Sequence, residues 1–342
     1  MRTPSKPQEI YNIIKNDILN KKYKINDKLP TEQQLLEMFS CDRSTIREVL
    51  TILSTEGIIK KKHGLGSFVT RIPSRGTIAV CVRFGNLTSL TDFYSRLINN
   101  INEFAEARGY DTILAVGYGE TIETIQKNID AYFRKPFSRE IVAVVNLLNF
   151  EINPLPVPTI NITSVVPFGD NCICIDYDEV VKKGKELMEN MGYKDTTIFY
   201  TLDSVEKAGE GIVNHINELA NSWTDNKDLK FEVDTYYGFY EKFKAWYESP
   251  KRTRAAFFLD DGLLELVIRF FYENSIKIPE EFGVLTYGNV HKYFNHSIDF
   301  HKLGADEKEL AKLVLENLDI LLKGKSIGTI KLPPHYHKGN SL

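Results

Sequence analysis

The chain has 342 residues, of which 42% are hydrophobic and 26% are charged. This balance excludes a wholly disordered or fibrous chain and allows two or three cores. No apolar run approaches the ~20 residues of a membrane span, and the first residues lack the apolar stretch of a secretory signal. With only four scattered cysteines, these features predict a cytoplasmic protein.

Charge is distributed unevenly along the chain. Residues 1–75 hold 14 Lys and Arg against 8 Asp and Glu, a net charge of +6, whereas the whole chain carries −3. A small basic head on a large acidic body indicates that only the head meets a polyanion. The alternative is chance variation in surface charge.

The first 56 residues carry the pattern of three helices. Apolar side chains recur at helical spacing in residues 8–22. Thr31 stands three residues before Gln34, the spacing of a capping box, and Asp42 is a good N-cap for a third helix. The apolar stripes expected to face a core are Ile10, Ile13, Ile14, Ile18 and Leu19, then Leu35, Leu36 and Phe39, then Ile46, Val49, Leu50 and Leu53.

After Gly57 the apolar period changes to two, which is typical of strands. Residues 58–62 and 67–70 are predicted strands, and the turn between them contains two glycines that can take positive φ. Three helices followed by a basic hairpin predict a winged helix-turn-helix over residues 1–72, with a short linker at 73–76.

Residues 29–72 resemble the DNA-binding head of GntR-family transcription regulators, through the run Asp-Arg-Ser-Thr-Ile-Arg-Glu and a Gly-x-Gly wing. Arginine can bind a guanine edge or a phosphate, and hydroxyls suit phosphate oxygens. The alternative for the arginines is a solvated helix face. The resemblance implies DNA contacts by Arg43, Ser44, Thr45 and Arg47 on the third helix and by His63 and Gly64 on the wing.

Two departures from the family pattern predict weaker DNA binding. Gln33 stands where many relatives have a DNA-contacting arginine. Asp42 replaces the more usual Ser or Thr, and its negative charge would lie close to phosphates.

From Thr77 onward, predicted strands alternate with helices of ~15 residues, the pattern of βαβ units and parallel sheets. The predicted strands lie at 77–82, 111–117, 140–148, 157–163, 172–176, 195–201, 229–236, 254–261 and 283–289; a long helix is expected at 302–324 and a last extended stretch at 329–337.

The body resembles the sugar-binding effector domain of the LacI/GalR family, which is similar to periplasmic binding proteins. The landmarks are Ile175 and Asp176 before a helix, and the run Ala-Ala-Phe-Phe-Leu-Asp-Asp at 255–261 followed by residues 278–289. A GntR head on such a body is the arrangement of the arabinose-repressor subfamily. The resemblance implies an α/β body over residues 77–342 with two lobes and three crossovers: lobe one at 77–174 and 303–325, lobe two at 175–302 and 326–342.

Ligands of open α/β sheets bind beyond the carboxyl ends of strands, and sugars need acids, amides and aromatic faces. The resemblance places Asp261 at a ligand-binding aspartate and Asn289 near a second acid; N-capping of a helix is the alternative role for Asp261. The other candidates at such positions are Arg83, Phe84, Phe93 and Tyr287.

Two arginines usual in relatives are missing, at residues 207–212 and at 163–164, and Asp260 stands where relatives have Asn. The effector is therefore a sugar, a sugar acid or a sugar phosphate, or the body binds none. No cofactor, metal site or catalytic arrangement is expected, since Cys172 with Cys174, and His335 with His337, lack partners for a metal.

The sequence predicts a dimeric transcription regulator, a repressor of carbohydrate-use genes whose effector binds between two lobes. Two heads would bind a DNA operator with two-fold symmetry. One alternative is a DNA-binding regulator whose body binds no small molecule and serves only dimerisation or protein contact. Another is an enzyme carried on a DNA-binding head.

Overall fold

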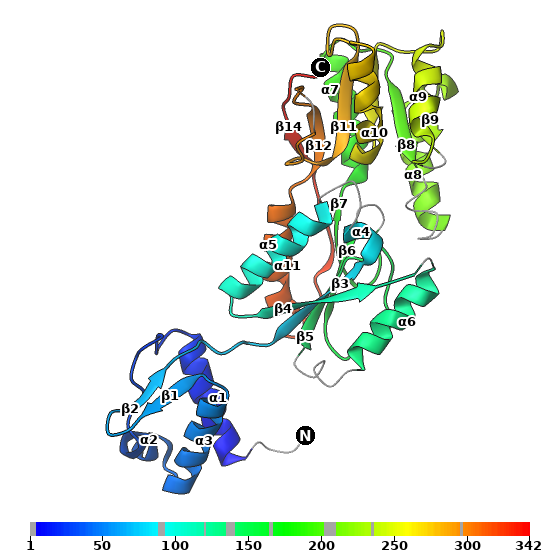
Figure 1. The fold of residues 1–342 in the computed structure, drawn as a ribbon. Helices are drawn as coiled ribbons and strands as arrows, with labels where there is room; N and C mark the ends of the chain where they lie inside the picture. The colour runs from blue at the N-terminus through cyan, green and yellow to red at the C-terminus, as the bar shows by residue number, and fades with distance from the viewer. Residues whose placement is uncertain are drawn as a thin grey trace. The chain divides into compact units, whose positions relative to one another are not determined.

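The computed structural model describes residues 5–87, 93–119, 121–134, 141–163, 167–201, 210–233, 236–294 and 297–342. The chain forms two compact units, residues 1–77 with 105–111 and residues 78–104 with 112–342 (Figure 1). Below, the head is residues 5–72 and the body is residues 78–342. None of the described helices is both long and apolar enough to cross a membrane.

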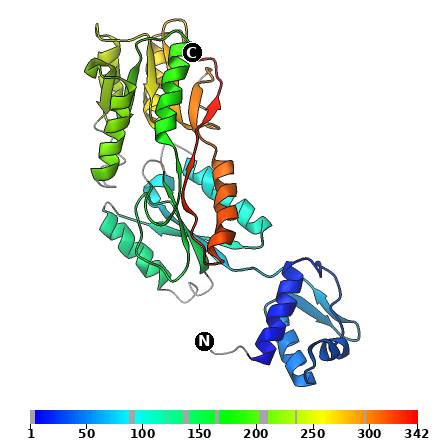
Figure 2. The same ribbon diagram turned by 180° about the vertical axis from the view of Figure 1, so that it is seen from behind.

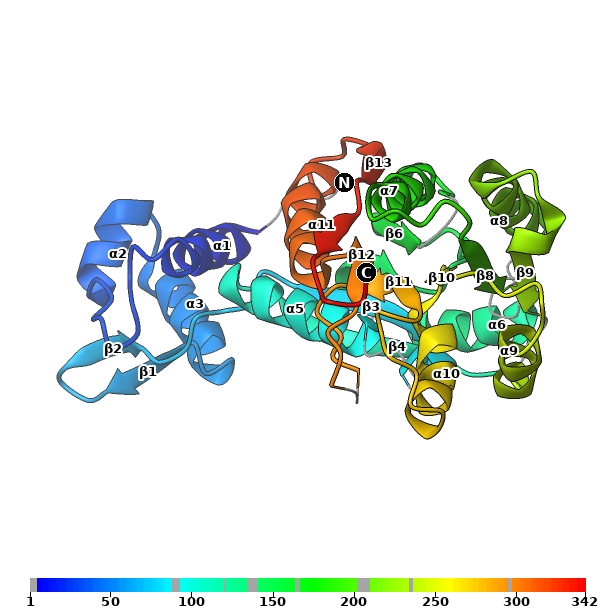
Figure 3. The ribbon, with the colours of Figure 1, turned by 90° about the horizontal axis from the view of Figure 1, so that it is seen from above.

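The head is a winged helix-turn-helix. Helices α1 (Lys6–Leu19), α2 (Glu32–Phe39) and α3 (Arg43–Thr55) precede an antiparallel hairpin of β1 (Ile59–Lys62) and β2 (Gly66–Val69), visible beside α3 in Figure 3. The expected capping box forms, since the Gln34 N–H donates to Thr31 and the Thr31 N–H donates to Gln34. Asp42 caps α3, as predicted, by accepting from the Thr45 N–H at 2.8 Å.

The head core is built around α3, whose four predicted apolar positions are all buried. Burying one such side chain is worth about 1.5–3 kcal/mol. In α1 the prediction was wrong at two positions: Ile13 is 46% exposed and Leu19 is only half-buried, whereas Tyr11 is buried. The Tyr11 hydroxyl donates to Glu56 at 2.6 Å, which ties α1 to the end of α3.

The first sheet of the body has six strands in the described part of the chain, in the order β13-β7-β6-β5-β3-β4. Helices α4 (Phe84–Leu87), α5 (Phe93–Ala107) and α6 (Ile122–Phe133) belong to this part. The strands are β3 (Thr77–Arg83), β4 (Asp111–Gly117), β5 (Ile141–Asn146), β6 (Thr159–Thr163), β7 (Asn171–Ile175) and β13 (Gly328–Leu332).

The second sheet also has six strands within the described residues, in the order β14-β12-β11-β10-β8-β9. Its helices are α7 (Tyr177–Asn190), α8 (Glu210–Trp223), α9 (Phe239–Tyr247) and α10 (Asp261–Glu273), with a 3-10 turn at Lys227–Leu229. The strands are β8 (Thr197–Thr201), β9 (Lys230–Val233), β10 (Ala255–Phe258), β11 (Gly283–Asn289), β12 (His301–Ala305) and β14 (His335–His337).

Side-chain alternation along β8 explains why helices cover both faces of this sheet. Ile198 and Tyr200 pack with α7 and α8, whereas Phe199 packs with α9 and α10. Successive strand residues point to opposite faces, so a strand that is apolar at every position needs a helix layer on each side. The expected α/β fold with mainly parallel sheets is confirmed.

The predicted helix at 302–324 was wrong at its start. Residues 301–305 form β12, parallel to β11, and the helix α11 (Glu307–Leu321) begins only after Asp306. Asp306 caps it by accepting from the backbone N–H groups of Lys308 and Glu309. The Gly-Ala-Asp sequence does not look like a strand. A glycine is nevertheless required here, because an added Cβ at Gly304 would meet the Gly288 carbonyl oxygen of the neighbouring strand at 1.6 Å.

The assignment of residues 326–342 to lobe two also needs correction. The extended stretch breaks at two prolines: β13 pairs with β7 in the first sheet, and β14 pairs antiparallel with β12 in the second. Residues 303–305 likewise belong to the second sheet. Within the described residues the chain passes between the sheets three times, and Figure 2 shows the red C-terminal segment making the last passage.

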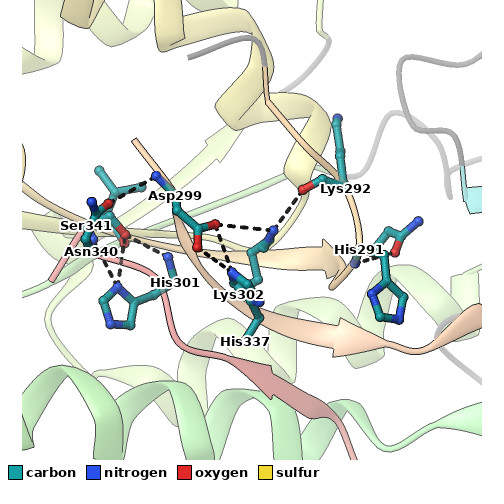
Figure 4. A network of polar contacts seen from close by, with 10 residues as sticks. His291, Lys292, Asp299, His301, Lys302, His337, Asn340 and Ser341 are labelled. Atoms are coloured by element: carbon teal, nitrogen blue, oxygen red, sulfur yellow. Dashed lines mark hydrogen bonds and ion pairs between the residues drawn. The ribbon is translucent and has the colours of Figure 1, made fainter. Parts of the chain in front are cut away.

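The C-terminal segment is held to the second sheet by a polar network (Figure 4). His337 Nε2 lies 2.8 Å from both oxygens of Asp299. Ser341 is fully buried: its hydroxyl donates to the Val284 carbonyl at 2.6 Å and its N–H donates to His301 Nδ1 at 3.1 Å. The end of the chain is thus part of the fold.

Candidate nucleic-acid interface and candidate effector site

The four predicted DNA-contacting residues of α3 lie at the helix start and on its surface. Arg43, Ser44 and Arg47 are exposed, and Thr45 is half-buried. The four apolar positions of the same helix are packed in the head core. The helix therefore presents two guanidinium groups one turn apart on its exposed surface, outside the apolar stripe that faces the core.

Two of these side chains are held by carboxylates. Arg47 Nε lies 3.2 Å from Glu32 Oε2, and the Ser44 hydroxyl donates to Asp42 at 2.5 Å. That hydroxyl bond, together with the Thr45 N–H, lowers the pKa of the Asp42 carboxyl. Asp42 therefore stays ionised at the start of α3.

The wing presents the two predicted residues at its turn. His63 and Gly64 are exposed, and Gly64 has φ 71°, a conformation that favours glycine. The sequence left Lys60, Lys61 and Lys62 open between a DNA-facing role and a solvated strand face; in the structure Lys61 Nζ donates to Thr51 Oγ1 at 3.3 Å and so links the wing to α3.

The candidate effector residues of the second sheet come together at its carboxyl edge. Asp261 is 4% exposed, accepts from the Asn289 N–H at 3.4 Å, and lies 3.9 Å from Lys292 Nζ. Gly288 makes this approach possible, because a Cβ there would come within 2.4 Å of the Asp261 carboxylate. Asp261 thus lies against β11, with its charge balanced by a buried lysine.

The N-cap role belongs to Asp260 and not to Asp261. Asp260 accepts from the Gly262 N–H at 2.7 Å and from the Tyr236 hydroxyl at 2.6 Å. Burial raises the pKa of its carboxyl, although both hydrogen bonds act in the opposite direction. Asp261 is consequently not needed to cap α10.

Tyr287 lies in a group of tyrosines that sequence analysis did not find. Its ring centroid is 4.6 Å from that of Tyr177. Tyr94 lies near both, with its hydroxyl accepting from Asn149 at 3.1 Å, and burial raises the pKa of all three phenols. Tyr177 stands two residues after the end of β7, so its place after a strand end was a usable signal.

The remaining candidates do not all lie together. Phe93 packs against the core that contains Tyr287. Arg83 ends β3 in the first sheet, and Phe84 is 52% exposed with its ring 5.8 Å from that of Tyr118. The positions of the missing arginines at Ser164 and at residues 207–209 lie outside the described residues.

A winged helix-turn-helix joined to a body of two doubly wound sheets is the domain architecture of a DNA-binding transcription regulator. Residues 6–69 match the family described as bacterial regulatory proteins, gntR family, so the head is a GntR-type DNA-binding domain.

Two curated relatives cover different shares of the chain. The Uxu operon regulator of Haemophilus influenzae is 39% identical over 61 residues, which are 18% of this chain and 23% of that protein. The chain therefore spans about a quarter of this relative. The arabinose metabolism transcriptional repressor of Geobacillus stearothermophilus is 19% identical over 291 residues, 78% of each chain.

Solved structures show the fold of the body. The lac repressor bound to ONPG in the repressed state matches with a TM-score of 0.64 at 11% identity, over 96% of this chain and 94% of that one. The lactose repressor bound to the anti-inducer ONPF matches with a TM-score of 0.63 at 12% identity, over 78% and 99%. The body has the fold of these LacI-family repressors.

Proposed function

We propose that the protein is a cytoplasmic, sequence-specific transcription regulator that represses carbohydrate-use genes and responds to a sugar or sugar derivative bound in its body. The observation that carries the DNA-binding part is the exposure of Arg43 and Arg47 on α3 while the apolar stripe of the same helix fills the head core. The carbohydrate part is supported by the names of the two curated relatives, a Uxu operon regulator and an arabinose metabolism repressor.

DNA binding is proposed to follow from the exposed groups of the head. Arg43 and Arg47 would enter a major groove, with Ser44, Thr45 and the helix N-terminus against phosphates. His63 and Gly64 of the wing would approach an adjacent minor groove. A homodimer would place two such heads on a two-fold symmetric operator, as supported by a similar lac repressor dimer bound to operator.

The effector site is proposed at the carboxyl edge of the second sheet. Carboxylates of Asp260 and Asp261 and the phenols of Tyr177 and Tyr287 are the donors and acceptors that sugar hydroxyls need. An effector that weakens DNA binding must itself be bound less tightly by the DNA complex, because the coupling free energy is reciprocal. No turnover is proposed, since the curated relatives are transcription regulators.

The test is a thermal-shift screen of sugars, sugar acids and sugar phosphates on the full-length protein. A compound that binds only the native state raises the melting temperature. We expect at least one such compound, and we expect it to change the affinity for operator DNA. If no compound shifts the melting temperature, the effector part of the proposal fails while DNA binding stands.

A body that binds no small molecule is the second candidate, favoured by the ion pairing of Asp261. Lys292 Nζ lies 3.9 Å from Asp261 and 3.3 Å from Glu265, so a buried cation already balances the candidate carboxylate. In that case the body serves dimerisation or protein contact. The same screen distinguishes the two candidates.

A further inference from the structure

Three side chains with metal-binding atoms meet just beyond the carboxyl ends of β11 and β12. His291 stands two residues after the end of β11, and Asp306 and Glu307 directly follow β12. These strands are parallel neighbours, with Asn289 opposite Ala305 in the register, so their ends lie together. One ligand atom from each of the three side chains lies within 4.8 Å of the other two.

Two of the three are already oriented toward each other. His291 Nε2 lies 3.3 Å from Asp306 Oδ2. The other oxygen of Asp306 accepts the N–H groups of Lys308 and Glu309, which leaves Oδ2 facing the imidazole. The His291 backbone is fixed as well, since its N–H donates to Asn289 Oδ1 at 2.8 Å.

Glu307 supplies an independent observation that points to a cation. Its side chain is only 4% exposed, and its Oε2 is buried with no hydrogen-bond partner among the described residues. The other oxygen, Oε1, lies 3.9 Å from Arg96. A buried carboxylate oxygen without a partner is costly, and a bound cation would satisfy it.

We propose that His291, Asp306 and Glu307 bind a divalent transition-metal ion, with Zn²⁺ as the best match to their chemistry. One imidazole nitrogen and two carboxylate oxygens are a donor set that zinc accepts, with water as the fourth ligand. The 3.3 Å between His291 Nε2 and Asp306 Oδ2 suits two ligands that are each about 2.1 Å from a tetrahedral ion. The half-exposed His291 can adjust to close the site.

The position at the N-terminus of α11 opposes a cation through the helix dipole. Two carboxylates reverse the local charge, and the backbone N–H groups nearest the site are already taken up by Asp306 Oδ1. The ion would tie the end of β11 to the start of the crossover helix α11. It would thereby fix the segment that begins at Asn289, next to the proposed effector site, although the inference does not depend on an effector.

The experiment is calorimetric titration of full-length, untagged, chelator-treated protein with ZnCl₂, and separately with MnCl₂ and MgCl₂. We expect one saturable Zn²⁺ site per chain, and His291→Gln should weaken it about tenfold or more. The matched control is His335→Gln, because His335 is a second half-exposed histidine that pairs with an acid of the same helix, Glu309. It should change the affinity by less than about twofold.

The variant Glu307→Gln and Co²⁺ absorption provide a second test of the same site. Glu307→Gln should also weaken Zn²⁺, and its melting temperature in chelator reports whether it folds. Because His291 is half-exposed, His291→Gln remains informative even if Glu307→Gln does not fold. Substitution with Co²⁺ should give visible absorption bands that His291→Gln reduces. Absence of saturable Zn²⁺ binding, or equal binding by His291→Gln and wild type, would overturn the proposal.

Discussion

Arg47 Nε lies 3.2 Å from Glu32 Oε2, so one of the two proposed DNA-reading arginines is paired with a carboxylate at the start of the neighbouring helix. The two side chains are 61% and 38% exposed. Solvent-exposed pairs of this kind contribute about 0–1 kcal/mol, less than the ~1–3 kcal/mol of a good base contact. A base or phosphate of DNA can therefore replace Glu32 as the partner of Arg47.

Glu32→Gln should strengthen binding to duplex DNA of any sequence by a factor of a few. The substitution removes the competing carboxylate and one negative charge near phosphates. Fluorescence anisotropy with operator and with random duplex measures the effect. Glu37→Gln is the matched control, since Glu37 is an exposed acid of the same helix whose partner is the neutral Gln33. Equal or weaker binding by Glu32→Gln would show that the pair does not compete with DNA.

Asp42→Asn should also strengthen DNA binding while leaving the head folded. Asparagine caps a helix about as well as aspartate does, so α3 keeps its start. In the structure the Ser44 hydroxyl donates to an ionised Asp42, and removing that charge weakens this bond, so a phosphate can compete for the hydroxyl. Affinity measured against salt concentration should rise at every ionic strength. A loss of affinity at an unchanged melting temperature would contradict this account of Asp42.

Acidification should destabilise the body through His301. The imidazole is 1% exposed, and burial lowers its pKa below the ordinary 6.5. Between the two pKa values the unfolded chain binds a proton that the folded chain does not, so stability falls as the pH drops below about 6.5 and levels off below the folded pKa. An NMR titration of the His301 ring measures this directly. A midpoint at or above 6.5 would refute it.

Asp261→Asn should weaken effector binding about tenfold or more without changing operator affinity in the absence of effector. Its carboxylate is a strong acceptor for sugar hydroxyls, and it lies far along the chain from the head. Lys292 keeps Glu265 as a partner at 3.3 Å, so the variant should remain folded. Calorimetry with the compound found in the sugar screen is the measurement. Unchanged binding would remove Asp261 from the site.

The head could be predicted from sequence almost completely, because its signals are local. The Thr31 cap, the Asp42 cap and the apolar stripe of α3 depend on residues within one or two turns of each other. Helix α1 is the exception, since the spacing of Ile13 fits the stripe but the aromatic Tyr11 is buried in its place, and Leu19 is only half-buried.

The body was harder to predict where tertiary pairing overrides local pattern. β12 contains Gly304 and is followed at once by Asp306, the N-cap of α11, so only its pairing with β11 identifies it as a strand. The break between β13 and β14 assigns adjacent residues to different sheets, which no periodicity can indicate.

The effector candidates show the same limit. Asp261 and Asn289 follow strand ends and could be found as such. The pairing of Asp261 with Lys292 depends on residues 31 positions apart along the chain and could not. Tyr94 was missed because an aromatic residue at a helix start gives no sign of which lobe it will face.

The central claim is that DNA is read by the exposed arginines of α3. The most direct measurement selects preferred sites from a random duplex library with the wild-type protein and then titrates Arg43→Ala/Arg47→Ala on the recovered site. The account predicts a two-fold symmetric site with half-sites roughly one helical turn apart, and a loss of at least about 1–3 kcal/mol in the double variant. Recovery of no preferred sequence, or wild-type affinity in the double variant, would contradict it.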